Sequence, residues 1–115
     1  MVENTRSAVS APAAAAPDTS HLAWPFFDDT HRAFAQDLVQ WVSRQPAHED
    51  HLGTDAQCRA WVQRLGQAGW LQHVVAPQTD AHLDTRKICL LRETLAYHDG
   101  LADFALAMQG LGSGA

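Results

Sequence analysis

The last stretch of the sequence, "HDGLADFALAMQGLGSGA", constrains the fold most, because as a helix it is apolar on nearly every side. Only Asp103 and Gln109 interrupt its run of apolar and small residues. Such a helix must be enclosed by protein or by membrane. The sequence argues against a membrane, because its longest apolar runs are far shorter than the ~20 residues that a spanning helix needs. We therefore expect other protein surfaces to cover this helix.

Composition narrows the class of protein. The 115 residues, 46% hydrophobic and 18% charged, fit one domain with a modest core. The net charge is −5 and the chain shows no basic stripe, which argues against binding to nucleic acid or to acidic membrane surfaces. The first residues lack the apolar block of a signal peptide. Cys58 and Cys89 lack metal-site spacing and are predicted to be buried free thiols, which suits a cytoplasmic protein.

The chain divides by composition at about residue 20. Residues 1–20, "MVENTRSAVSAPAAAAPDTS", are rich in Ala, Pro and Ser and contain almost nothing large to bury. Such a segment cannot offset the entropy of ordering its own backbone, so we expect a disordered tail. Residues 21–115 are expected to form the folded domain.

Two helices are expected in the first half of that domain. The first carries Phe34, Leu38, Trp41 and Val42 on one side, with Asp28 or Asp29 as its cap and an end before Pro46.

The second helix is expected to begin at Thr54, which has capping-box spacing with Gln57. It places Cys58, Trp61, Val62 and Leu65 on one side. After it, Gly69 suits the left-handed position just past a helix, which would let Trp70 fold back over Leu65.

Two more helices follow a polar connection that contains Pro77. The third is expected at about 85–98, with Asp84 as its cap, and Asp99 and Gly100 break it. It carries a wide apolar surface, which indicates a central position. One arc of this surface consists of Ile88, Leu91 and Leu95, and the adjoining arc consists of Leu90, Thr94 and Tyr97. The terminal segment is the fourth helix, and Gly110, Gly112 and Gly114 are expected to end it. The prediction is an all-α, antiparallel bundle of about four helices, in which short connections favour packing between consecutive helices.

Motifs that carry chemistry are scarce. "HEDH" places His48 and His51 beside two carboxylates, but it lacks the spacing of a zinc helix, so a solvated loop is favoured over a metal site. Glu93 and Asp99 could be considered an acid/base pair, although a helical glutamate is more often a surface or ion-paired residue. The other histidines are scattered. The residues alone identify no catalytic and no cofactor-binding group.

Three segments, in order, resemble the N-terminal helical domain of the acyl-CoA dehydrogenase family. They are "WPFFDDTHRAFAQDLVQWV", "VQRLGQAGWLQHVVAP" and "CLLRETLAYHDGLADFALAMQGLGSGA", and together they cover about 24–115. The most recognisable pieces are "LGQAGW", the proline Pro77 that follows, and "ETLAYHDG" around Glu93. One departure is that "APQTDAHLDT" lacks the paired glycine that the family usually has after the proline.

The resemblance implies an FAD-dependent oxidoreductase that dehydrogenates an acyl-CoA thioester between its α and β carbons. It also implies a middle β domain and a C-terminal bundle, which hold most of the FAD and supply the catalytic base, outside this chain. Residues 21–115 are then a domain truncated before the middle β domain, and we expect this chain alone to be inactive and to hold no FAD. The implied partners are acyl-CoA, electron-transferring flavoprotein and further copies of the enzyme in a homo-oligomer.

Matching the terminal helix to the family's pocket helix places four residues nearest the acyl chain: Asp103, Phe104, Ala107 and Met108. Met and Phe at helical spacing are also ordinary packing residues, so a purely structural role for these four stays open. A second function stays open as well. The chain could be a non-catalytic helical module that self-associates or packs on a partner chain through its apolar faces.

Overall fold

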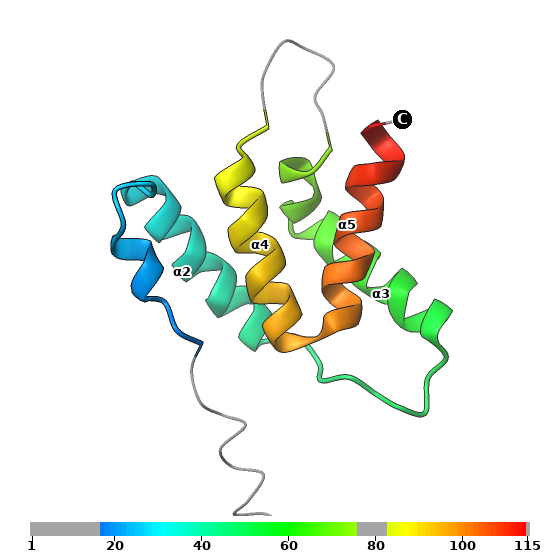
Figure 1. The fold of residues 1–115 in the computed structure, drawn as a ribbon. Coiled ribbons are helices and arrows are strands. Elements are labelled where there is room, and N and C mark those ends of the chain that lie inside the picture. Colours follow the sequence, from blue (N-terminus) through cyan, green and yellow to red (C-terminus); the bar gives the residue numbers. More distant parts are fainter. Residues whose placement is uncertain (1–16, 76–82, 115) are drawn as a thin grey trace, which may run out of the picture.

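The computed structural model describes residues 17–75 and 83–114, and over these ranges the chain is helical with no strand. Within these ranges the chain forms two short 3₁₀ helices and four α-helices, arranged as in Figure 1. In chain order the elements are η2 (Ser20–Ala23), α2 (Asp29–Ser43), α3 (Thr54–Gln67), η3 (Trp70–His73), α4 (Thr85–His98) and α5 (Gly100–Gly114). The predicted all-α helical bundle is confirmed. No helix in the described ranges combines the length and apolar composition needed to cross a membrane.

Helix α4 occupies the central position that its wide apolar surface predicts, because it packs against both α2 and α5. The expected antiparallel packing is found for α4 and α5, which form a helical hairpin (Figure 1). Helices α2 and α4 run in the same direction, since His31 in the first turn of α2 contacts Asp84 just before α4. The expectation that consecutive helices pack closely together is wrong for α2 and α3, which meet through the rings of Trp41 and Trp61. Instead, α3 packs against α5 and η3.

The core lies where the four helices meet. Its largest fully enclosed apolar side chains are leucines, one or two from each helix: Leu38, Leu65, Leu91, Leu95 and Leu106. Aromatic rings extend this core beneath η3, with Trp41 lying between Trp61 and Trp70 at centroid distances of 6.4 and 5.9 Å. These edge-on and tilted arrangements are the ones that aromatic quadrupoles favour.

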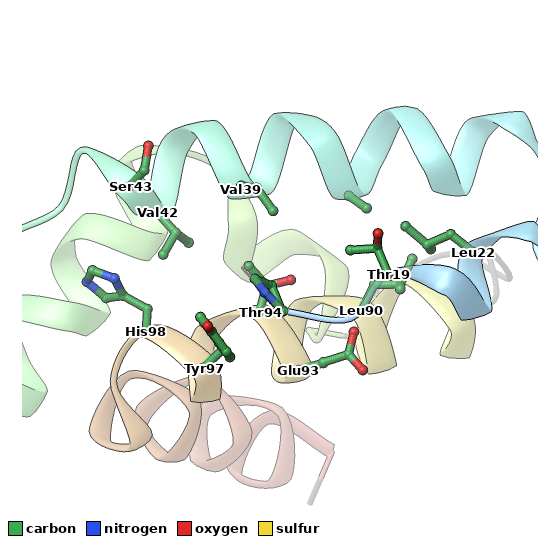
Figure 2. A pocket seen from close by; sticks show the side chains of 12 residues that line it. Thr19, Leu22, Val39, Val42, Ser43, Leu90, Glu93, Thr94, Tyr97 and His98 are labelled. Atoms are coloured by element: carbon green, nitrogen blue, oxygen red, sulfur yellow. The ribbon is translucent and has the colours of Figure 1, made fainter. Parts of the chain in front are cut away.

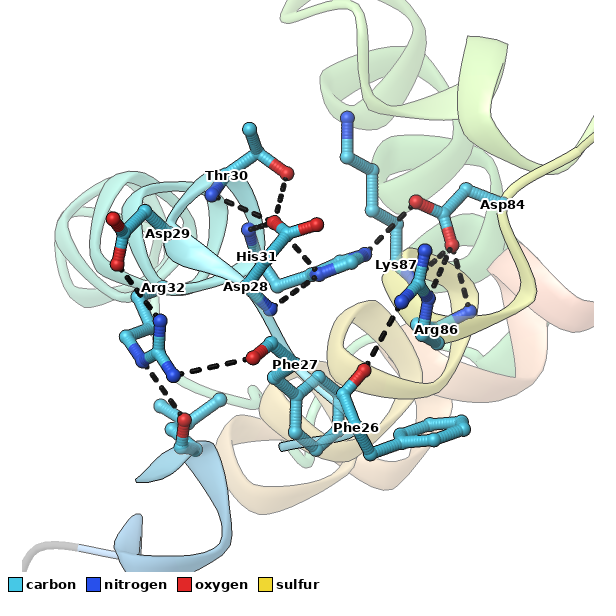
Figure 3. Close-up of polar contacts among 11 residues, drawn as sticks. Phe26, Phe27, Asp28, Asp29, Thr30, His31, Arg32, Asp84, Arg86 and Lys87 are labelled. Atoms are coloured by element: carbon cyan, nitrogen blue, oxygen red, sulfur yellow. Dashed lines mark hydrogen bonds and ion pairs between the residues drawn. The ribbon is translucent and has the colours of Figure 1, made fainter. Parts of the chain in front are cut away.

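The starts of α2 and α4 are built as predicted from aspartate caps (Figure 3). Asp28 accepts hydrogen bonds from the backbone N–H groups of Thr30 and His31, and His31 Nδ1 accepts the Asp28 N–H in return. His31 Nε2 lies 2.9 Å from Asp84, which also accepts the N–H groups of Arg86 and Lys87. One buried imidazole therefore ties the two helix starts together.

The predicted capping box of α3 is wrong. Gly53 is the N-cap, and no side chain caps this helix. Gln57 is buried instead, where its side chain donates to the Leu52 carbonyl and accepts the Glu49 N–H. The Gln57 side chain is thus used to fix the preceding loop rather than the first turn.

Gly69 is left-handed as predicted, with φ of +88°. Its N–H donates to the Gly66 carbonyl at 3.2 Å, which closes the end of α3. The chain then turns into η3, and Trp70 packs its ring against Phe34 and Trp41 of α2. A residue with a side chain is strained at this backbone angle, so glycine is required here for a conformational reason.

Two expectations about the ends of the domain are corrected. Pro17 and Thr19 already line a hollow of the fold, and Ser20 begins η2, so the ordered chain starts before residue 21. Residues 1–16 of the predicted tail and the connection with Pro77 lie outside the described residues.

At the other end, helix α5 continues through Gly110 and Gly112, so these two glycines do not end it, and its last residue is the third predicted glycine, Gly114. This part of α5 packs on the segment after η3, since a Cβ on Gly110 would lie 3.4 Å from Val74, at ordinary contact distance.

Both cysteines are free thiols as predicted, but the prediction that they are buried is wrong. Cys58 is half-buried in α3. Cys89 is exposed on α4, because it lies between the positions that pack on α2 and those that pack on α5.

Candidate functional site

Helix α5 has an uncovered apolar surface on the side that faces away from the core. Phe104, Met108 and Leu111 retain 55%, 44% and 69% of their accessible surface. Their spacing of four and three residues places them on one side of the helix. We call these three residues the α5 outer strip. The opposite side of α5, with Ala102, Ala105 and Leu106, is buried in the core.

A hollow of about 300 Å³ lies beside this strip, between α4, α5 and the end of η3. We call it the α5 hollow; it is lined by Val74, Ile88, Arg92, Leu106, Ala107, Gly110 and Leu111. Leu111 belongs to both the hollow and the strip, so the two form one continuous apolar surface. The small side chain of Ala107 and the missing side chain of Gly110 leave the space open.

Asp103 forms an ion pair with Arg92 at one edge of this surface. Both of its carboxylate oxygens accept hydrogen bonds from Arg92, at 2.8 Å from Nε and 2.9 Å from Nη2. This two-pronged contact raises the pKa of the Arg92 guanidinium, through its hydrogen bond to Asp103 and the charge of that carboxylate. Asp103 is therefore turned toward α4, and Arg92 brings a fixed positive charge to the edge of the hollow.

The four predicted pocket residues thus occupy three neighbouring settings on α5. Ala107 lines the hollow, Asp103 pairs with Arg92 at its edge, and Phe104 and Met108 lie on the outer strip. A role in the core is excluded for Phe104 and Met108 within the described structure, because both are substantially exposed.

The "HEDH" segment forms a loop between α2 and α3, as predicted, and both of its histidines are exposed. His48 lies with Nδ1 3.3 Å from Asp99 and Nε2 3.4 Å from Asp50. Within residues 17–75 and 83–114, no group of three or more His, Cys, Asp or Glu side chains could hold a metal ion. Through His48, the loop instead contacts Asp99 at the start of α5. Asp99 also accepts the Leu101 N–H and the Trp61 indole N–H.

Glu93 and Asp99, considered above as an acid/base pair, belong to separate networks. Asp99 is buried at the start of α5, whereas Glu93 is exposed on α4 with its carboxylate 3.1 Å from His21 Nε2. The described structure does not bring the two carboxylates together for shared chemistry.

A second hollow, of about 350 Å³, lies between α2 and α4 on the side away from α5 (Figure 2). We call it the α2/α4 groove. Its residues are Pro17, Thr19, Leu22, Ala35, Val39, Val42, Ser43, Leu90, Glu93, Thr94, Tyr97 and His98. This groove was not predicted from the sequence. The sequence signal that could have indicated it is the apolar arc of Leu90, Thr94 and Tyr97 on α4. Helix α2 covers only part of this arc, and the rest lines the groove.

The described residues do not build a site that fits FAD. Such a dinucleotide needs backbone N–H groups or cations around its pyrophosphate, usually at a glycine-rich turn that opens a helix. Gly110, Gly112 and Gly114 lie inside or at the end of α5. At its start, Gly100 follows the buried Asp99, whose carboxylate already accepts the Leu101 N–H. Arg92 at the α5 hollow is paired with Asp103. We therefore assign no redox step to these residues.

Neither a scan of the chain against models of protein families nor a search of curated proteins found a match.

Proposed function

We propose that this chain is the N-terminal helical domain of an FAD-dependent acyl-CoA dehydrogenase, in which α5 forms part of the wall of the acyl pocket. The resemblance of three ordered segments to that family supports the proposal. The observation that carries it is the uncovered apolar surface of α5, formed by the outer strip and the α5 hollow. An acyl chain is an apolar ligand, and pockets for such ligands are lined mostly by apolar side chains.

The proposed roles follow from the setting of each residue. Ala107 leaves room for the chain because its side chain is a single methyl group. Phe104 and Met108 supply apolar area along the same wall. Asp103 acts through Arg92, since their pair fixes the edge of the hollow and keeps the guanidinium in one place. The catalytic base, the flavin site and the contact with electron-transferring flavoprotein are assigned to parts of the enzyme other than this chain.

The direct test is to express the complete open reading frame that contains this chain and to purify its product. The proposal expects a yellow flavoprotein whose visible flavin absorption is lost when acyl-CoA is added without oxygen. The same preparation should reduce an artificial electron acceptor in proportion to acyl-CoA. A colourless protein, or a flavin that no short, medium or long acyl-CoA reduces, would refute the proposal.

A tryptophan at Ala107 tests the pocket wall separately from the chemistry. Ala107→Trp fills the hollow, so the enzyme should lose activity on long acyl chains while it keeps activity on short ones. Ala33→Trp is the matched control, because Ala33 is exposed on α2, a helix that contributes nothing to the hollow. If both variants have the same chain-length profile as the parent protein, α5 does not line the acyl pocket.

The same uncovered surface also supports a second candidate, a non-catalytic helical module that self-associates or packs on a partner through α5. Exposed apolar patches of this kind often mark protein interfaces. If the purified protein contains no flavin, analytical sedimentation over a range of protein concentrations tests whether the chain self-associates. Self-association that Met108→Glu abolishes would favour the module, and a monomer at every concentration would argue against its self-associating form.

We also propose a cytoplasmic location. The support is that Cys58 and Cys89 are both free thiols, which suits a reducing compartment.

A further inference from the structure

The α2/α4 groove is a hollow of finite length with an apolar interior. Two helices form its long sides, with Val39 on α2 facing Thr94 on α4 across it (Figure 2). Thr19 and Leu22 lie at one end, and Ser43 and His98 lie at the other. Its volume of about 350 Å³ is at the lower end of the range for small-molecule sites, so it suits a compact ligand rather than a long peptide.

The groove carries one carboxylate and no fixed positive charge. Among its described residues, Glu93 is the acidic side chain, and none is lysine or arginine. Glu93 retains 56% of its side-chain exposure, so its carboxylate is accessible from the groove. Tyr97 lies one helical turn further along the same side of α4.

The neighbouring His21 contacts one of the two carboxylate oxygens of Glu93, Oε1. Its Nε2 is 3.1 Å from the carboxylate, yet that nitrogen is buried and forms no hydrogen bond in the described structure. Glu93 therefore keeps hydrogen-bonding capacity for a cation that reaches it from the groove.

From this arrangement we infer that the α2/α4 groove binds a small organic amine with an apolar body. The apolar body lies among Ala35, Val39, Val42 and Leu90, and the ammonium group lies at Glu93 beside the Tyr97 ring. Charge complementarity selects the amine over neutral or acidic analogues of the same shape. The site lies on the opposite side of α4 from α5, so it does not depend on the proposed acyl pocket.

The test compares two ligands with the same apolar body, one ending in a charged ammonium group and the other in a neutral hydroxyl. The ¹⁵N-labelled chain is titrated with 2-phenylethylamine and with 2-phenylethanol, and the backbone amide signals are followed by NMR. We expect saturable shifts at Val39, Glu93 and Thr94, with the amine binding about three- to fivefold more tightly than the alcohol, as a partly exposed ion pair allows. Equal affinities, no saturable shift, or shifts confined to other parts of the chain would overturn the inference.

Three variants locate the effect. Glu93→Gln should remove the preference for the amine and leave the affinity for the alcohol unchanged. Val39→Phe should fill the groove and weaken both ligands at least tenfold. Asp37→Asn removes the same charge from an exposed position of α2 outside the groove and should change neither affinity. An amine preference that survives in Glu93→Gln would also overturn the inference, and that variant is expected to fold because its side chain is exposed.

Discussion

Replacing His31 by leucine should destabilise the fold strongly, because His31 joins α2 to α4 (Figure 3). Its side chain is 1% exposed and both of its ring nitrogens are engaged. The Asp28 N–H must donate to Nδ1, so the proton is on Nε2, which donates to Asp84. Leucine keeps an apolar contact with Phe27 but can form neither bond.

The magnitude follows from the two lost hydrogen bonds. The bond from the Asp28 amide is worth about 1 kcal/mol, and the orphaned N–H adds a penalty of about 1 kcal/mol. A bond to a carboxylate is worth about 1.5–3 kcal/mol, which we reduce to about 1 kcal/mol because Asp84 is 34% exposed and water can replace the imidazole. The expected loss is about 2–3 kcal/mol, a large share of the ~5–15 kcal/mol that holds a domain together.

Urea unfolding followed by far-UV circular dichroism measures this loss, and thermal melting should show a midpoint lower by about 10–20 °C. His51→Leu is the control, because His51 is 77% exposed in the loop and its loss should stay within about 0.5 kcal/mol. Asp84→Ala should be non-additive with His31→Leu, since both remove the same bond. A loss below about 0.5 kcal/mol for His31→Leu would refute the idea that this imidazole joins the two helices.

Three further predictions concern local features. Gly69→Ala should lower the free energy of unfolding by about 1–2 kcal/mol in urea titrations, because alanine is strained at φ of +88°; an unchanged midpoint would contradict this. Hydrogen bonds from the Thr30 hydroxyl and, to a smaller extent, from backbone N–H groups lower the pKa of Asp28 to about 2. Because the unfolded chain then takes up a proton on Asp28 at higher pH than the folded chain does, stability should fall as the pH drops from about 4 to about 2. Asp28→Asn should flatten that part of the stability profile, and an unaltered slope would show that Asp28 is not responsible. In the Arg92–Asp103 pair the Arg92 side chain is 52% exposed and the Asp103 side chain 17% exposed. The pair should give a double-mutant coupling below about 1 kcal/mol that weakens in high salt, and a larger, salt-independent coupling would contradict its contact with solvent through Arg92.

Local signals explain which parts of the fold the sequence predicted well. The bounds of α4 follow from Asp84 before it and from Asp99 and Gly100 after it. The prediction for Gly69 depended only on the left-handed backbone angle of that one residue. These features depend on a few neighbouring residues, so a single sequence contains the information for them.

Long-range packing explains what the sequence did not predict. Gly110 stays inside α5, where it packs against Val74, although glycine on its own favours an end to the helix. The parallel arrangement of α2 and α4 and the buried role of His31 depend on Asp84, which is 53 residues away along the chain. The α2/α4 groove also forms between helices distant in the sequence, so its apolar arc on α4 could be noticed but not its shape.

The candidate site shows the same division. The helical spacing of Phe104 and Met108 placed them near one side of α5, and their exposure follows from which side faces the core. The pairing of Asp103 with Arg92 depends on the hairpin between α4 and α5, which spacing within one helix does not reveal.

The central claim is that the outer side of α5 contacts an acyl chain, and Met108 offers the most direct measurement of it. Selective ¹³C labelling of methionine methyl groups in the complete enzyme gives a signal from Met108, which is assigned by its absence from a Met108→Leu variant. In the purified flavoprotein, saturating acyl-CoA should shift the Met108 signal while CoA without the acyl group leaves it unchanged. A Met108 signal that does not move while the enzyme binds and oxidises its acyl-CoA would contradict the account.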